Sequence, residues 1–394
     1  MNPQPIIEFT NFTFKYFSQA EPTLHDINLK IYAGEKILIV GPSGSGKSTL
    51  GHCLNGLIPF SYRGEIQGSL KIKGEETSTL NIFNLSKTIG TVLQDSDGQF
   101  VGLTVGEDIA FALENDNIAR DFMRQRVQEV SRMVDMDSWL SSSPFELSGG
   151  QKQRTSLAGV MIDDVEILLF DEPLANLDPA TGKTAIEIID DIHKQSGKTI
   201  IIIEHRLEDV LHRDVDRVIV VNDGRITADM DAHALVASPI LLDTGIREPL
   251  YVTALKYAGV EITPQMRAGH IETLKTEFSR AALQNWHEHI PAPDVRDSRA
   301  SILKMENVAF SYDGARPVLA DISFDIQEGE MVSIVGKNGA GKSTLSKLLC
   351  GFEKEDSGRI LYRGEDIRVK SIKERAEIIG LVMQNPNQMI SKPL

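Results

Sequence analysis

Decisive for the fold of this chain is the stretch Gly41-Pro42-Ser43-Gly44-Ser45-Gly46-Lys47-Ser48-Thr49. It fits the phosphate-loop pattern G-x-x-x-x-G-K-[ST] at every fixed position. The apolar run 36–40 before it predicts a buried strand, and residues 48–57 after it have helical spacing. A strand, a glycine loop and a helix in this order are the context that the motif requires. The stretch therefore predicts a loop that holds phosphate groups in an α/β domain.

The chain contains a second loop of the same kind. Residues 304–312 echo residues 7–16, and a strand, a glycine loop and a helix are expected to follow again. The pattern is a duplication of two units rather than a long array of repeats. The second loop consists of Gly336, Lys337, Asn338, Gly339, Ala340, Gly341, Lys342, Ser343 and Thr344.

Several residues in the first unit suit phosphate chemistry. Backbone N–H groups of the loop and the positive end of the next helix can hold the β- and γ-phosphates of a nucleotide. Lys47 adds a positive charge, and the Ser48 hydroxyl is placed to bind Mg²⁺. Asp171 and Glu172 follow the apolar run 167–170, so both carboxylates emerge at the tip of a buried strand. We expect Asp171 to bind the metal ion and Glu172 to polarise the attacking water.

Another segment with anion-binding character precedes a predicted helix. It offers a hydroxyl and bare amides, as a helix N-terminus does. Ser-Gly-Gly is also a common loop sequence, so the position of the segment shortly before Glu172 is what favours a functional role. The segment is Leu147, Ser148, Gly149, Gly150 and Gln151.

Apolar runs alternate with helical segments in the first part of the chain. The runs 166–170 and 199–203 are typical of strands that are covered on both faces of a parallel sheet. The fold class is therefore α/β. The alternation of apolar runs and helical segments changes near residue 223. We expect a complete domain at 4–225, a connector with helical segments at 226–300 and the N-terminal part of a second domain at 301–394.

The composition is that of a globular protein, with 41% hydrophobic and 25% charged residues. A net charge of −15 argues against a broad nucleic-acid surface. Cys53 and Cys350 are expected to be small buried residues. The longest purely aliphatic run, 200–203, is too short to cross a bilayer.

In order and spacing, these motifs resemble the ATP-binding subunit of ATP-binding-cassette transporters. The resemblance covers residues 6–225, with a second copy at 302–390. It implies a P-loop ATPase fold in which a mostly parallel sheet is joined by antiparallel β and helical subdomains, with the second copy partial. The matching pieces are the two phosphate loops, Gln94, the 147–151 segment, Asp171 and Glu172, residues 175–178 and His205.

The resemblance also implies residue roles. Tyr16 would stack on adenine, as Tyr312 would in the second copy. Glu172, His205 and Gln94 would be catalytic; His205 would hold the γ-phosphate and the water in register. Asp178 would communicate across a dimer in which each phosphate loop faces the other domain's 147–151 segment. The implied cofactors are ATP and Mg²⁺, with the metal held by Ser48, Gln94, Asp171, Ser343 and Gln384.

Further stretches resemble energy-coupling-factor importers, namely 99–111, 204–210 and 245–251. Two such domains in one chain are similar to the branch linked to thiamine or its hydroxymethylpyrimidine precursor. The resemblance implies a peripheral protein at the cytoplasmic face of the cell membrane, which powers the import of a vitamin or precursor through integral membrane subunits. The apolar stretch 100–113 suits the docking of a membrane subunit.

Other functions are also compatible with a duplicated ATPase. A tandem-cassette translation factor would need a basic linker to bind ribosomal RNA, whereas residues 223–300 hold eight Lys and Arg against eleven Asp and Glu. A DNA-repair ATPase would need a long coiled-coil insertion, and no sustained heptads occur. A non-hydrolysing fragment is the third alternative. A second segment like 147–151, which would face the first loop, is expected beyond residue 394. Neither ATP site is therefore expected to be complete within the chain.

Overall fold

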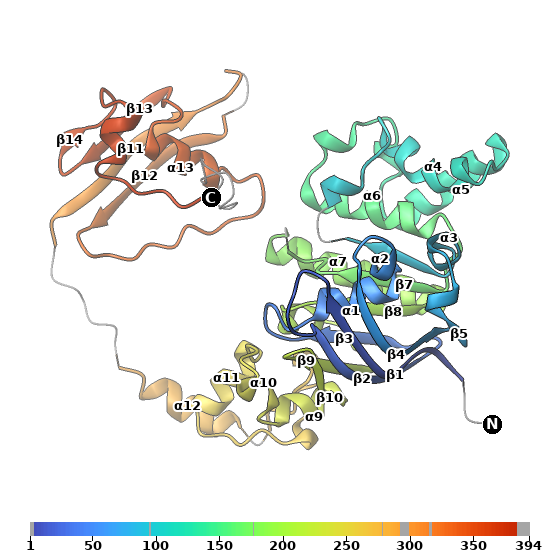
Figure 1. Ribbon diagram of the computed structural model, residues 1–394. Helices are drawn as coiled ribbons and strands as arrows, with labels where there is room; N and C mark the ends of the chain where they lie inside the picture. The colour runs from blue at the N-terminus through green and yellow to red at the C-terminus, as the bar shows by residue number, and fades with distance from the viewer. Residues whose placement is uncertain are drawn as a thin grey trace. The chain divides into compact units, whose positions relative to one another are not determined.

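The computed structural model describes residues 4–93, 96–175, 177–277, 279–291, 299–314 and 317–383. The chain divides into two compact units, Met1–Ile290 and Pro291–Leu394. Figure 1 shows both units, coloured from blue at the N-terminus to red at the C-terminus. The first unit holds the 41–49 loop, and the second unit holds the 336–344 loop.

A six-stranded sheet forms the centre of the first unit. Its order is β10-β9-β3-β8-β7-β6, and all neighbours are parallel except β10, which runs antiparallel to β9. Every residue of β3, β7 and β8 is buried, which confirms the prediction from the apolar runs. The strands are β3 (Lys36–Val40), β6 (Ile89–Val92), β7 (Ile167–Asp171), β8 (Thr199–Ile203), β9 (Arg217–Asn222) and β10 (Arg225–Met230).

Alternate residues of β3 contribute to two different cores, because successive side chains of a strand point to opposite faces of the sheet. Ile37 and Ile39 pack with α1 (Lys47–Leu54) and with a second, antiparallel sheet. Leu38 and Val40 lie in the core that includes α7 (Pro179–Ser196). The antiparallel sheet has the order β2-β1-β4-β5 and consists of β1 (Pro5–Tyr16), β2 (Leu24–Tyr32), β4 (Gly64–Ile72) and β5 (Glu75–Glu76).

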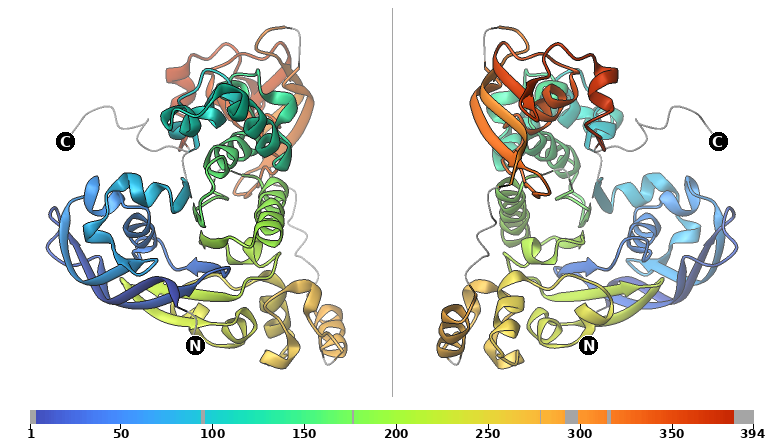
Figure 2. Two further views of the ribbon diagram at one scale, coloured as in Figure 1. Left: turned by 90° about the vertical axis from the view of Figure 1, so that its right-hand side faces the viewer. Right: turned by 90° about the vertical axis from the view of Figure 1, so that its left-hand side faces the viewer.

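Three helices gather beside the sheets as a helical subdomain, seen in teal and green in Figures 1 and 2. They are α4 (Val105–Asn115), α5 (Arg120–Met133) and α6 (Gly149–Met161). Thr104 caps α4 and Ser148 caps α6, each in a reciprocal capping box that satisfies N–H groups of the first turn. The short elements of this unit up to residue 210 are α2 (Leu57–Phe60), η1 (Thr77–Thr79), α3 (Ile82–Ser86), η2 (Ser96–Gln99), η3 (Asp137–Trp139), η4 (Pro144–Glu146) and α8 (Leu207–Val210).

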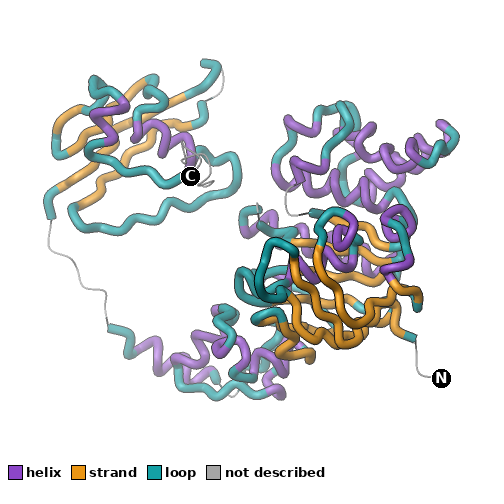
Figure 3. The backbone as a smooth tube through the Cα atoms, viewed as in Figure 1, coloured by secondary structure: helices purple, strands orange, loops and turns teal. Residues whose placement is uncertain are grey.

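Residues 226–290 fold with the first unit, so the boundary expected at residue 225 is not a boundary between compact units. Leu235, Leu241 and Leu255 are buried in the same core as Val218 and Val220 of β9. The change in pattern near residue 223 therefore marks a change of secondary structure, seen in Figure 3, and not the end of a core. The elements are α9 (Ala232–Ala237), α10 (Ile240–Asp243), α11 (Leu250–Tyr257), η5 (Pro264–Met266), η6 (Ile271–Thr273) and α12 (Arg280–Glu288).

The second unit repeats the antiparallel sheet of the first unit and its loop-bearing helix. Its strand order, β12-β11-β13-β14, corresponds to β2-β1-β4-β5. Met305 and Ile360 of this sheet pack with Leu345 and Leu348 of the helix. The structure thus confirms the duplication. The elements are β11 (Ser301–Phe310), β12 (Leu319–Gln327), α13 (Lys342–Cys350), β13 (Ser357–Tyr362), β14 (Glu365–Asp366) and α14 (Ile372–Ala376).

The prediction of a strand immediately before the second loop was wrong. Residues 331–335 form no regular structure and are exposed, whereas the corresponding run Lys36–Val40 is a buried strand. In the first unit β3 is hydrogen-bonded to β8 on one side and to β9 on the other. Within 299–314 and 317–383 no strand lies beside residues 331–335. An apolar run becomes a strand only where neighbours take its backbone hydrogen bonds.

A buried ion pair generates the first testable prediction. Lys36 of β3 pairs with Asp190 of α7, which is 3% exposed. Asp190→Ala would leave a buried ammonium group without its partner, so we expect the free energy of unfolding to fall by about 3–5 kcal/mol. Urea denaturation of the full chain measures the loss. Glu166→Ala breaks the exposed Lys73–Glu166 pair and should cost less than about 1 kcal/mol; equal losses would contradict the prediction.

Candidate functional site

The 41–49 loop leaves the carboxyl end of β3 and turns directly into α1. Gly46, the residue before the helix, has a φ of 102°, which favours glycine. A Cβ on Gly41 would lie 2.1 Å from the carbonyl oxygen of Val221, so the loop packs too closely on β9 for a side chain there. The Ser45 hydroxyl is buried and has no hydrogen-bond partner among the described residues. The glycines thus allow a tight loop whose amides surround a position for an anion.

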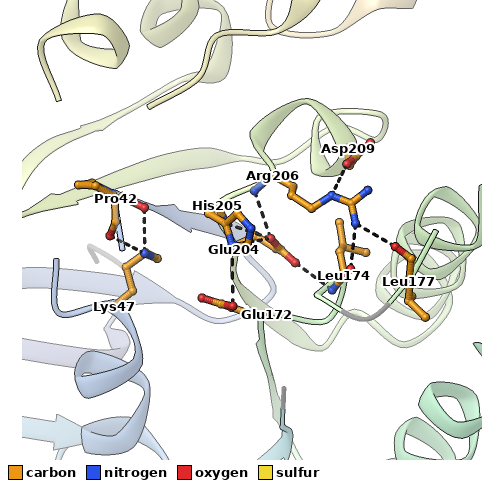
Figure 4. Close-up of polar contacts among 10 residues, drawn as sticks. Pro42, Lys47, Glu172, Leu174, Leu177, Glu204, His205, Arg206 and Asp209 are labelled. Atoms are coloured by element: carbon orange, nitrogen blue, oxygen red, sulfur yellow. Dashed lines mark hydrogen bonds and ion pairs between the residues drawn. The ribbon is translucent and has the colours of Figure 1, made fainter. Parts of the chain in front are cut away.

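Lys47 lies at the first position of α1 and is only 5% exposed. Its Nζ donates to the carbonyl oxygens of Gly41, at 2.8 Å, and Pro42, at 2.9 Å (Figure 4). Burial lowers the pKa of the ammonium group, while nearby carboxylates, first among them Glu172, act in the opposite direction. The two hydrogen bonds therefore hold the charged end of Lys47 against the backbone of the loop.

Asp171 is the last residue of β7 and supplies a buried carboxylate, 8% exposed. Burial, and then the negative charge of Glu172, raises the pKa of Asp171 to about 6. The nearby Ser48 side chain acts to lower this pKa, while Oδ1 of Asp171 has no hydrogen-bond partner among the described residues. A buried carboxylate beside a hydroxyl is a pair of hard oxygen donors, which Mg²⁺ prefers.

The donor set is too small to hold a metal ion without help. In the described part of the chain, no cluster of three or more His, Cys, Asp or Glu side chains is suited to a metal ion. Mg²⁺ commonly takes one or two protein oxygens and completes its coordination with phosphate and water. Ser48 and Asp171 therefore fit a magnesium ion that arrives with a nucleotide.

Glu172 and His205 face each other at the ends of adjacent strands. Glu172 follows β7, and its N–H donates to the carbonyl oxygen of Ile203, the last residue of β8. Its φ of 49° is unusual for a residue with a side chain. Nδ1 of His205 lies 3.8 Å from Oε2 of Glu172 (Figure 4). A carboxylate and an imidazole at this distance can share the orientation of one water molecule.

Sequence reasoning missed two residues that flank His205. Glu204 is fully buried, and Nδ1 of His205 also lies 3.6 Å from its Oε2. Arg206 reaches back to the carbonyl oxygens of Leu174 and Leu177. One signal was available in the sequence, because Glu204 follows the apolar run 199–203 just as Asp171 follows 167–170.

The 147–151 segment forms the capped start of α6. The Gln151 N–H donates to Oγ of Ser148 at 3.4 Å, and Oε1 of Gln151 accepts from the Ser148 N–H at 2.9 Å. Asp178 similarly caps α7 by accepting hydrogen bonds from the N–H groups of Ala180 and Thr181. Both segments are therefore helix N-termini, a form suited to binding anions.

Tyr16, at the end of β1, is joined to the loop by a hydrogen bond. Its hydroxyl lies 3.1 Å from Oγ1 of Thr49. The second unit repeats the contact between Tyr312 and Thr344 at 3.3 Å. The aromatic ring is thus fixed close to each phosphate loop.

The second loop keeps the local bonding of the first. Nζ of Lys342 donates to the carbonyl oxygens of Gly336, at 2.6 Å, and Lys337, at 2.9 Å. Residues 336–340 are exposed, however, unlike the first loop's buried base. Gln94 and Gln384 lie outside the described residues, so their expected metal-binding roles stay predictions.

Comparisons with known proteins give a consistent picture. A family model described as ABC transporter matches residues 24–175 and 319–392. A second model, described as ATP-binding cassette cobalt transporter, matches residues 238–310. The chain is 55% identical over its full length to a protein of Clostridium perfringens (strain 13 / Type A) named as an ABC transporter ATP-binding protein, of which it covers 69%. It is also 55% identical, over 98% of its length, to a protein with the same description from Photobacterium profundum, of which it covers 68%.

Two solved structures share the fold. One is cbiO1 from Clostridium perfringens, described as part of the ABC transporter complex cbiONQ; it is 27% identical, with a TM-score of 0.56, and the match covers 64% of this chain and 99% of that one. The other is the ATP-binding cassette MJ0796, dimeric and bound to ADP and Pi, at 27% identity and a TM-score of 0.50 over 57% of this chain and 98% of that one. Both matches agree with an α/β nucleotide-binding fold.

The buried Asp171 carboxylate predicts a pH-dependent cost to folding. Its pKa of about 6 lies above its ordinary value of 3.8, so the folded chain retains the proton to higher pH than the unfolded chain. Stability should therefore fall as pH rises from about 4 to 6. Asp171→Asn removes this dependence, and we expect it to raise the free energy of unfolding at pH 7.5 by about 1–3 kcal/mol.

The gain should shrink as the pH falls and disappear below about pH 3.8, where the carboxyl group is protonated in both states. Thermal unfolding of the nucleotide-free chain at pH 4.5 and pH 7.5 measures the difference. Asp137→Asn, which removes an exposed carboxylate, is the matched control and should change neither value. A gain of equal size at both pH values would refute the electrostatic cause.

Proposed function

This chain belongs to the ABC transporter family of ATP-binding proteins, and we propose that its first unit binds and hydrolyses Mg-ATP to energise the import of a small solute. One observation carries the proposal: Lys47, Asp171, Glu172 and His205 converge where the parallel strands β3, β7 and β8 end. That arrangement combines a phosphate-binding loop, a metal-binding carboxylate and a carboxylate that can activate water.

Nucleotide binding would begin with an exchange of the hydrogen-bond partners of Lys47. The ammonium group now donates to the carbonyl oxygens of Gly41 and Pro42, and β- and γ-phosphate oxygens would replace them. The loop amides and the N-terminus of α1 supply further donors. The Tyr16 ring, fixed through Thr49, would stack on adenine.

The site would take Mg²⁺ together with the nucleotide, and the ion would supply positive charge against the phosphates. Asp171 and Ser48 are the residues that would hold it, and a positive ion would relieve the repulsion between Asp171 and Glu172.

Glu172 and His205 have complementary roles in the proposed hydrolysis. Water attacks the γ-phosphorus, the bond to the bridging oxygen of the β-phosphate breaks, and ADP and inorganic phosphate are released. Glu172 orients the water and takes its proton, while His205 holds the γ-phosphate and the water in line. Lys47 stabilises the negative charge of the transferring group.

In the proposed ATPase, each phosphate loop faces the 147–151 segment of another domain, so a complete ATP site combines residues of two domains. Asp178, at the start of α7, would carry the state of one site to the other.

Separate membrane subunits complete the proposed transporter, with the chain at the cytoplasmic face of the membrane. Among the described helices, none combines the length and the apolar character that a membrane crossing requires. Leu103 is 81% exposed, and Val101 and Phe111 are also exposed. A cavity of ≈ 330 Å³ lined by Leu57, Ile82 and other residues could receive part of a partner helix. The exposed apolar side chains support docking in the 100–113 region, and the cavity lies outside that stretch.

The solute is proposed at the level of its class. The likeness to cbiO1, part of the cbiONQ transporter complex, supports an importer of the energy-coupling-factor kind. We propose a vitamin or vitamin precursor of the thiamine or hydroxymethylpyrimidine type as the solute. Cobalt is the second candidate, because the family model that matches residues 238–310 is described as a cobalt transporter. Uptake of labelled thiamine against radioactive cobalt by cells with and without the gene distinguishes the two.

Nucleotide binding tests the proposal directly. Lys47→Ala removes the charge that would meet the phosphates, and we expect the Kd for Mg-ATP to rise at least about 10-fold. Glu172→Gln should leave the Kd nearly unchanged, because Glu172 acts on water. Titration with a fluorescent ATP analogue measures both. Lys342→Ala is the matched control at the second loop; if Lys47→Ala bound as tightly as wild type, the first loop would not be the main site.

Turnover tests the catalytic assignment. We expect the rate per chain to rise with protein concentration, because the 147–151 segment of a second chain would face the first loop. At every concentration Glu172→Gln should lower kcat by about 10²–10⁴-fold, since the water loses its base. Phosphate release measures both effects. Fast turnover that does not depend on protein concentration would contradict the need for a partner, and an active Glu172→Gln variant would contradict the role of Glu172.

A further inference from the structure

Glu204 joins two segments that are distant in sequence. Its side chain is 0% exposed and lies directly after β8. Oε1 accepts a hydrogen bond from the Leu174 N–H at 2.8 Å. Oε2 accepts from the N–H groups of His205, at 2.9 Å, and Arg206, at 3.1 Å (Figure 4). One carboxylate thus binds the segment of Glu172 and the segment of His205 together.

Arg206 joins the same two segments, but it donates hydrogen bonds where Glu204 accepts them. Its Nη1 donates to the carbonyl oxygens of Leu174, at 2.8 Å, and Leu177, at 3.3 Å. Its Nε donates to Oδ2 of Asp209 at 2.7 Å, which orients the guanidinium group. The residues before and after His205 therefore hold both polar groups of one residue, the N–H and the C=O of Leu174.

Leu174 lies between two of the residues assigned to the ATP site. It lies two residues after Glu172, whose side chain faces His205, and four residues before Asp178. A displacement of His205 would be transmitted by Glu204 and Arg206 to the backbone between Glu172 and Asp178. The segment of His205 and residues 172–178 would move as one body.

We propose that Glu204 and Arg206 are positioning residues, which clamp the segment of His205 to residues 172–178 and so couple the γ-phosphate contact to Glu172 and Asp178. The proposal rests on the proposed ATPase function for its role, although the clamp itself is visible without nucleotide. Glu204 and Arg206 need not touch the reacting atoms.

The chemistry explains why a carboxylate stands at position 204. An ionised carboxylate only accepts hydrogen bonds, and its two oxygens can serve all three N–H groups. A glutamine of nearly the same shape would place an NH₂ donor against one of the two segments. The buried negative charge is stabilised by the three N–H groups. Glu204→Gln therefore removes the link with little change in volume.

Hydrogen exchange on the full nucleotide-free chain tests the clamp. In Glu204→Gln we expect at least about 10-fold faster exchange at both 174–178 and 205–206, because local opening exposes both segments together. Glu248→Gln is the matched control: this carboxylate is also buried but pairs with Lys256, so both segments should keep wild-type rates. Faster exchange at 205–206 alone, or at neither segment, would overturn the proposal.

Arg206→Lys provides a second variant in case Glu204→Gln folds poorly. It keeps the charge but loses the planar group that reaches two carbonyl oxygens. We expect faster exchange at 174–178, again together with 205–206. Wild-type exchange at 174–178 would show that Arg206 does not hold this segment.

Kinetics separates a positioning role from a merely structural one. In Glu204→Gln the KM for Mg-ATP should stay within about threefold, while kcat falls on the order of 10- to 100-fold, as for catalytic groups displaced by about an ångström. A rise in KM without a fall in kcat would overturn the positioning role. If the wild-type chain bound no Mg-ATP, the proposed function would fail, whereas the exchange result would still decide the clamp.

Discussion

The pairing of β8 with β3 on one side and with β7 on the other is the constraint on which the site depends. Parallel strands end at the same edge of a sheet, and ligands bind outside those ends. Ile203, the last residue of β8, is in register with Ile39 of β3 and with Asp171 of β7. The phosphate loop, the two carboxylates and His205 therefore meet although they lie far apart along the chain. A slip in either register would separate them.

This arrangement concentrates features that are unfavourable in isolation. Asp171 is a buried carboxylate beside another carboxylate, and Glu172 has a left-handed backbone conformation. Strain and like charges of this kind persist only where the surrounding structure holds them in place. Here the strands beneath are buried on both faces, and Glu204 and Arg206 fix the backbone beyond them. The site thus gains a fixed geometry at a cost in stability.

The two units show how much of such a site is local. Lys342 bonds the carbonyl oxygens of Gly336 and Lys337 just as Lys47 bonds those of Gly41 and Pro42. The glycine loop and the helix after it thus form with or without a strand in front. The apolar run 331–335 does not become a strand, because strand formation needs hydrogen-bonding neighbours and helix formation does not.

The sequence by itself determined the α/β class, the duplication, both phosphate loops and the ends of β7 and β8 that carry Asp171, Glu172 and His205. These features depend on short-range patterns, namely apolar runs and glycine spacing. Only the tertiary structure placed residues 226–290 in the first core, left 331–335 unpaired and showed that Glu204 and Arg206 hold Leu174. Each of these outcomes depends on a partner far away in the chain, and a pattern of neighbouring residues contains no information about which distant groups it will meet.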